Sequence, residues 1–259
     1  MKKREERKYF DKEWMGMKSS LLAFFEKEDQ EDLHRFRVQV KKLRAFLILS
    51  DSTGHQPNLA LYFKPVKKIF KEAGEIRNAF INQELAKEHQ TGDNAFISSQ
   101  CQLQIDATAK FRSNRARHLE KIKDTHDAIK EKIRSISDLH IGLFYQKMLQ
   151  QISGILANLK FNEDLHGCRT QVKNLTYNHK LVHSALAIAF NADYMHRVQT
   201  LIGDWHDNAL LIQLYSGDKA MAASLKKQHT KLKRAITLLT KDFFNQATTV
   251  VELPVEQLS

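Results

Sequence analysis

Apolar residues recur along the chain at intervals of three and four, which is the spacing of an amphipathic α-helix. No stretch shows the strict apolar–polar alternation that is typical of a β-strand. The sequence therefore predicts an all-α protein. Start and stop signals indicate eight helices: residues 10–27, one that carries 32–47 and ends near Asp51, one entered at Pro57 and Pro65 that ends near His89, one from Asp93 or Asn94 to near Ser135, one from Ser137 to near Lys160, one after Asn162 that is broken at 191–193, one that ends at Tyr215, and one that ends near Thr248.

One stretch of the pattern occurs twice. Residues 32–43 return at 164–175, with Asp, Leu, His, Arg, Gln, Val, Lys and Leu in the same places at an offset of 132. A period this long is not that of a solenoid repeat, and it indicates that one helical unit was duplicated. We expect a first four-helix half at residues 1–136, in which 1–8 are a frayed lead-in, a second half at 137–249, and a tail at 250–259.

Each copy carries an apolar stripe beside a basic one when it is placed on a helical wheel. The apolar stripes, predicted to face a core, are Leu33, Phe36, Val40, Leu43 and Leu47 in the first copy and Leu165, Cys168, Val172 and Leu175 in the second. The basic stripes, called the basic rows below, are His34, Arg37, Lys41 and Arg44 in the first copy and His166, Arg169 and Lys173 in the second. The remaining face of the first copy is predicted to be solvent-exposed and consists of Arg35, Gln39 and Lys42.

The basic rows predict an anion site. Like charges at helical spacing destabilise a helix by a few tenths of a kcal/mol per pair, and a solvated face would more often include Glu or Asp. The second row is poorer in charge, because Asn174 and Thr176 stand where the first copy has Lys42 and Arg44. Lys180, one turn beyond Thr176 on the same face, is a candidate substitute.

A second motif also occurs in both halves. Gly74-Glu-Ile-Arg-Asn matches Gly203-Asp-Trp-His-Asp. Glycine inside a helix costs roughly 1 kcal/mol relative to alanine, so its presence in both copies indicates a close helix–helix contact or a kink. Basic residues precede it and are further candidates for the anion site: Lys64, Lys67 and Lys71 in the first half, with Arg77 inside the motif, and His196 and Arg197 in the second half.

The composition is consistent with this interpretation. Only 9 Gly and 3 Pro occur in 259 residues, which favours helices over a loop-rich fold. The 41 Lys and Arg exceed the 30 Asp and Glu, for a net charge of +11, so we expect polyanionic partners such as nucleic acid, acidic lipid or a phosphate polymer.

The remaining signals concern compartment and core. No apolar run is long enough to span a membrane, and no secretory signal is evident, so we expect a cytoplasmic protein without a membrane partner. Two cysteines, Cys101 and Cys168, do not make a disulfide framework, and Cys168 is predicted to pack in the core. Trp14 and Trp205 are likewise predicted to be core residues rather than ligand platforms.

Three other functions are compatible with parts of the sequence. Nucleic-acid binding fits the net charge equally well, although the basic rows carry few aromatic residues for base stacking. A phosphotransfer protein could use His34 as its phosphoacceptor, but no phosphate-binding loop or acidic metal cluster accompanies it. Glu31 and Glu163 stand three residues before His34 and His166, as in di-iron bundles, but the cations that follow each histidine oppose a metal ion. We therefore expect no metal, no cofactor and no catalysis.

These residues together resemble the CHAD domain, a histidine-containing α-helical family associated with inorganic polyphosphate. The family signature His-x-x-Arg-x-x-x-basic-basic-Leu-Arg is similar to His34, Arg37, Lys41, Lys42, Leu43 and Arg44. The motifs at Gly74 and Gly203 resemble its second signature, with Asn78 where an Asp is expected.

The resemblance implies two four-helix bundles related by a pseudo-twofold axis, with a basic groove or channel between them. It also implies binding of polyphosphate without chemistry, and leaves association with polyphosphate granules and the oligomeric state open. The candidate contacts of first rank are His34, Arg37, Lys41, Arg44, His166, Arg169 and Lys173. Those of second rank are Lys64, Lys67, Lys71, Arg77, Lys180, His196 and Arg197.

Overall fold

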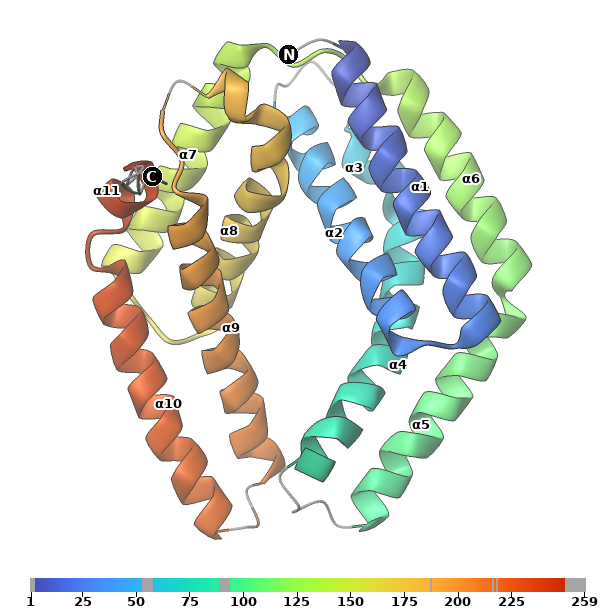
Figure 1. Cartoon of the computed structure of the whole chain (residues 1–259), viewed down its shortest axis with the longest axis vertical. Helices are drawn as coiled ribbons and strands as arrows, with labels where there is room; N and C mark the ends of the chain where they lie inside the picture. Colours follow the sequence, from blue (N-terminus) through green and yellow to red (C-terminus); the bar gives the residue numbers. More distant parts are fainter. Residues whose placement is uncertain are drawn as a thin grey trace, which may run out of the picture. The chain divides into compact units, whose positions relative to one another are not determined.

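The computed structural model describes residues 3–52, 58–88, 94–186, 188–215, 217 and 219–249. Within these residues the chain forms helices and connecting loops and no strand, which confirms the all-α prediction (Figure 1). The chain divides into two compact units, Met1–Ile136 and Ser137–Ser259. None of the helices in the described part is both long enough and apolar enough to cross a lipid bilayer.

The first unit is a bundle in which α1 packs on α2 and α6, and α4 packs on α2, α5 and α6. A sharp turn joins α1 to α2, with Glu28 at a φ of 56°. The side chain of Asp29 then caps α2 by accepting the N–H of Glu31 at 3.0 Å. The helices of this unit are α1 (Lys3–Lys27), α2 (Gln30–Asp51), α3 (Leu59–Tyr62), α4 (Lys64–Glu88), α5 (Asn94–Ser113) and α6 (Arg115–Lys132).

In the second unit α8 packs between α7 and α9, α10 packs on α9, and the short α11 packs on α7 and α9. Side-chain oxygens of Ser137, Asn162 and Asn191 cap α7, α8 and α9 by accepting backbone N–H groups of their first turns. The elements are α7 (Asp138–Ala157), α8 (Glu163–Val182), the 3-10 turn η1 (His183–Ala185), α9 (Ala192–Leu214), α10 (Lys219–Thr240) and α11 (Phe243–Thr248).

The predicted cores are confirmed. Every residue of the two apolar stripes is at most 4% exposed, and Trp14 and Trp205 are also buried. Cys168 lies in the core of the second unit, where burial raises the pKa of its thiol to about 12. The predicted solvent face of α2 is partly wrong: Gln39 and Lys42 are half-buried, and the Lys42 ammonium lies 3.5 Å from a carboxylate oxygen of Glu13 on α1.

Several predicted boundaries are wrong. Residues 3–8 are the start of α1 rather than a frayed lead-in, because the buried carboxylate of Glu6 accepts the N–H of Ile136 at 2.8 Å. The helix predicted up to Ser135 is two helices, because the Asn114 amide donates to the Lys110 carbonyl and competes with the helical backbone. The sixth predicted helix ends at Val182, and the eighth is interrupted before Phe243. The predicted features at Pro57, Asp93 and residues 250–259 lie outside the described residues.

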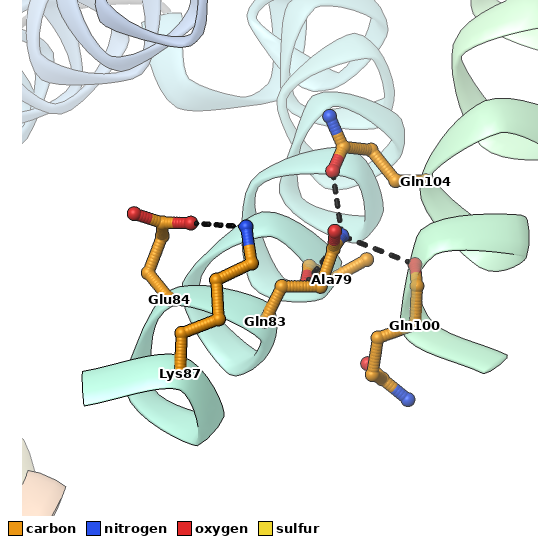
Figure 2. A network of polar contacts seen from close by, with 6 residues as sticks. All are labelled: Ala79, Gln83, Glu84, Lys87, Gln100 and Gln104. Atoms are coloured by element: carbon orange, nitrogen blue, oxygen red, sulfur yellow. Dashed lines mark hydrogen bonds and ion pairs between the residues drawn. The ribbon is translucent and has the colours of Figure 1, made fainter. Parts of the chain in front are cut away.

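A buried glutamine holds α4 to α5. The Nε2 of Gln83 lies 2.7 Å from Oε1 of Gln104, 3.3 Å from the Gln100 carbonyl and 3.2 Å from the Ala79 carbonyl (Figure 2). Gln83 is 7% exposed, so its amide would have to remain paired within the protein.

The variant Gln83→Ala is expected to lower the free energy of unfolding by about 1–3 kcal/mol, because acceptors that are buried or half-buried lose their donor. Denaturant unfolding measures the loss. Lys87→Ala is the matched control on the same helix, since it removes only the exposed 3.0 Å pair with Glu84 and should cost less than about 1 kcal/mol. Equal losses in the two variants would contradict the structural role of Gln83.

Candidate anion-binding site

The site begins with an arginine of α2 that contacts α4. The Nη1 of Arg37 donates to the Phe70 carbonyl at 2.7 Å, and its guanidinium carbon lies 4.2 Å from the centre of the Phe70 ring. The side chain is half-buried in this position. Arg37 is therefore held by α4 while it carries its charge at the edge of the core.

The second unit repeats this contact. The Nε of Arg169 on α8 donates to the Gln199 carbonyl of α9 at 2.9 Å. In both units the accepting carbonyl belongs to the residue four positions before the motif glycine. The same arginine thus bonds to the same place on its neighbouring helix in both halves of the duplication.

The two motif glycines make room for these arginines. A Cβ placed on Gly74 would lie 2.5 Å from Nη1 of Arg37, and one placed on Gly203 would lie 2.6 Å from Nη2 of Arg169. The close helix contact predicted from the glycines is therefore confirmed, and it is a contact between an arginine and a glycine. We call this arrangement the arginine clamp: the arginine packs against the glycine and donates a hydrogen bond to the carbonyl four residues before that glycine.

The first basic row lies in its own positive field. The pKa of His34 is below its usual value because of desolvation of the ring and the charges of Arg77, Lys41 and Arg37, against an opposing effect of Glu31. Burial, together with Arg77, also lowers the pKa of Arg37. Arg77 thus joins the predicted row from α4, and its guanidinium lies 5.0 Å from the centre of the Phe80 ring.

The second basic row contains a histidine pair. The ring centres of His166 and His206 are 4.3 Å apart. Desolvation lowers the pKa of His166, and so do His206 and Arg169, against the opposing charges of Glu163 and Asp207. Burial and Arg169 lower the pKa of Lys173, which Asp207 opposes.

Sequence reasoning missed His206 as a site residue. It occupies the position in the second glycine motif that Arg77 occupies in the first, so the repeat already contained the signal. Asp207 in turn stands where the first half has Asn78, which makes the second row less positive. The two halves therefore share one geometry and differ in charge.

The remaining candidates are distributed unevenly. Arg44, Lys64, Lys67, Lys71 and Lys180 are exposed on α2, α4 and α8. Lys67 and Lys71 precede Gly74 by seven and three residues, so they lie along the α4 face that meets Arg37. In the second unit His196 precedes Gly203 by seven residues, as Lys67 precedes Gly74, so by the same spacing it lies along the α9 face that meets Arg169. His196 and Arg197 also line a groove with Leu238 and Leu239 of α10.

Within the part of the chain that the structure describes, three arginines of the site lack the carboxylate partners that balance the cations on the adjacent face of α2. Arg35 pairs with Asp32, and Lys42 with Glu13. Among the residues the structure describes, Arg44, Arg77 and Arg169 have no carboxylate within 4.0 Å. The described part of the chain also contains no group of three or more His, Cys, Asp or Glu residues arranged to hold a metal ion. The arrangement can bind anionic oxygens through fixed cationic donors.

Comparison with known proteins identifies the family. The model of the CHAD domain family matches residues 17–216, which is most of the chain. The fold is similar to that in the crystal structure of the CHAD domain from the plant Ricinus communis, with a TM-score of 0.66 and 17% sequence identity over 93% of this chain and 91% of that one. No curated protein sequence matches the chain. The basic rows, the glycine motifs, the all-α fold and the family match agree, and the chain belongs to the CHAD domain family.

Proposed function

We propose that this CHAD domain binds inorganic polyphosphate through the basic rows of both units and does no chemistry on it. The observation that carries the proposal is the duplicated row of cations, in which an arginine clamp holds one arginine of each unit. Within the described residues, Arg44, Arg77 and Arg169 also have no carboxylate within 4.0 Å. A phosphate chain offers only charge and oxygen acceptors. Arginine forks and lysine ammonium groups at helical spacing match those features.

The row offers little to a nucleic-acid base. In the first unit the guanidinium groups of Arg37 and Arg77 lie over the rings of Phe70 and Phe80. Tyr177 in the second unit is half-buried. Single-strand binders usually present open aromatic faces for stacking, so these contacts favour a polyanion without bases.

A competition titration tests this function. Long-chain polyphosphate should bind at physiological salt, and an excess of tRNA or of duplex DNA should fail to displace it. Because any polyanion binding weakens with salt through counterion release, salt sensitivity alone does not discriminate. Equal displacement by nucleic acid would show a general polyanion surface, and no binding of polyphosphate would refute the proposal.

Affinity for polyphosphate is expected to rise as pH falls from 8 to 5.5. In the empty protein the pKa values of His34 and His166 are below their usual value, and a bound phosphate chain should raise them. Protons are then taken up on binding, which strengthens binding at low pH by up to about tenfold per pH unit for each histidine. Dissociation constants measured across this range check the effect.

The histidine variants and the empty protein provide the controls. The double variant His34→Gln, His166→Gln should lose most of this pH dependence, and if it retains all of it the histidines are not responsible.

Without ligand, the stability of the fold is expected to change with pH in the opposite direction to the binding affinity. Because the pKa values of these histidines are lowered in the folded state, the unfolded chain binds protons first as pH falls. Their contribution to stability is therefore fully present above the unfolded value of 6.5 and falls below it. Thermal unfolding should therefore occur at lower temperature at pH 5.5 than at pH 8.

A further inference from the structure

A second basic surface lies between α1 and α6. A depression of about 650 Å³ is lined there by Arg4, Arg7, Lys8 and Asp11 of α1 and by Lys130 of α6. The α1 residues are spaced at i, i+3, i+4 and i+7, so they share one face of the helix. Four cations and one carboxylate therefore converge on one depression.

The single carboxylate is already neutralised. An oxygen of Asp11 lies 2.9 Å from Nζ of Lys130, and its other oxygen lies 2.9 Å from Nε2 of His126. Within the described residues, Arg4, Arg7 and Lys8 have no carboxylate within 4.0 Å. The Nε of Arg7 is buried and has no hydrogen-bond partner there. Three positive charges thus remain unbalanced at the depression.

The depression is separate from the basic row. Around the first bundle α1 contacts α2, α2 contacts α4, α4 contacts α6, and α6 contacts α1, so the α1–α6 side is opposite the α2–α4 side (Figure 1). The three unbalanced cations also precede residue 17, where the match to the family model begins. The row on α2 and α4 therefore cannot account for this second surface.

We propose that the α1–α6 depression is a second anion site, which takes a compact oligophosphate. Arg4 and Arg7 would offer guanidinium forks to phosphate oxygens, and Lys8 a point charge. The paired Asp11 and Lys130 also line the depression, and their ion pair holds α6 beside α1. A compact anion with several charges suits three cations within two helical turns better than a single phosphate does.

Calorimetric titration of the full chain with tripolyphosphate at physiological salt tests the site. The double variant Arg4→Gln, Lys8→Gln changes only exposed side chains and leaves Arg7 and the Asp11–Lys130 pair in place. It should weaken one tripolyphosphate binding event at least tenfold. Lys226→Gln with Lys227→Gln, an equal loss of charge at exposed positions on α10, should leave that event within twofold of the wild type.

Lysine acetylation with and without tripolyphosphate locates the event. Tripolyphosphate is expected to protect Lys8 from acetylation in the wild type. The same protection is expected in the double variant Lys41→Glu, Arg44→Glu, which disrupts the row on α2. The proposal for the second site and the proposal for the row can therefore be refuted independently. Any one of three results would overturn the second site. These are unchanged affinity in the Arg4→Gln, Lys8→Gln variant, equal weakening in the α10 control, and no protection of Lys8. Retained helical circular dichroism in every variant ensures that folded proteins are compared.

Discussion

The double variant Lys41→Glu, Arg44→Glu is expected to weaken binding of long-chain polyphosphate by about 100-fold or more at physiological salt. Each hydrogen bond to a charged group contributes about 1.5–3 kcal/mol, so two lost contacts exceed the 2.8 kcal/mol that corresponds to 100-fold. Reversing the charges adds repulsion to the loss. The fold should persist, because Arg44 is exposed and Lys41 is half-buried, and neither is part of an arginine clamp.

The matched control is Lys226→Glu with Lys227→Glu, which makes the same charge change on exposed positions of α10. Fluorescence anisotropy with labelled polyphosphate, over a range of salt concentrations, gives both the affinity and its salt dependence. The row variant should show a shallower salt dependence, because fewer counterions are released when fewer cations contact phosphate. If the control loses as much affinity as the row variant, binding depends on net charge rather than on the row.

Gly74→Ala is expected to destabilise the protein, although alanine is the better helix former. The new Cβ would lie 2.5 Å from Nη1 of Arg37 and displace it from the Phe70 carbonyl. Losing that charge-assisted bond costs about 1.5–3 kcal/mol, whereas the helix gains about 1 kcal/mol from alanine. The net loss is therefore about 0.5–2 kcal/mol in the free energy of unfolding.

The sign should reverse when the arginine is absent. In an Arg37→Met background the clamp is already lost, so Gly74→Ala should stabilise by up to about 1 kcal/mol. Denaturant unfolding of the four proteins in this double-mutant cycle measures the coupling directly. Gly154→Ala on α7 is the control, since a Cβ there meets nothing within 4 Å, and it should stabilise in either background. The same sign for Gly74→Ala in both backgrounds would mean that the clamp is not the reason for the glycine.

Local features of the fold could be predicted because nearby residues determine them. The caps at Ser137 and Asn162 and the apolar stripe from Leu33 to Leu47 follow from spacing and side-chain chemistry within a few residues. The break at Asn114 could not be predicted in this way, because an asparagine inside a polar helix is compatible with continuation or interruption.

The arginine clamp was beyond sequence reasoning for a different reason. Arg37 and Phe70 are 33 residues apart, and only tertiary packing brings the guanidinium to that carbonyl. Both clues were visible, an arginine and a glycine that recur in each half, but nothing in the spacing connects them. Arg37 and Arg169 were predicted as ligand contacts. The structure shows that each also bonds to its own bundle, so a variant of either would confound binding with stability.

The clamp also constrains how this chain can change over time. Since the duplication, Arg77 and His206 have come to differ, as have Asn78 and Asp207, while the arginine and the glycine stand in both halves. A larger residue at the glycine is harmful while the arginine is present, and loss of the arginine leaves an unfilled space beside the glycine. Neither position can change alone at low cost, so we expect the two positions to change together. Among related sequences, loss of the arginine should accompany replacement of the glycine.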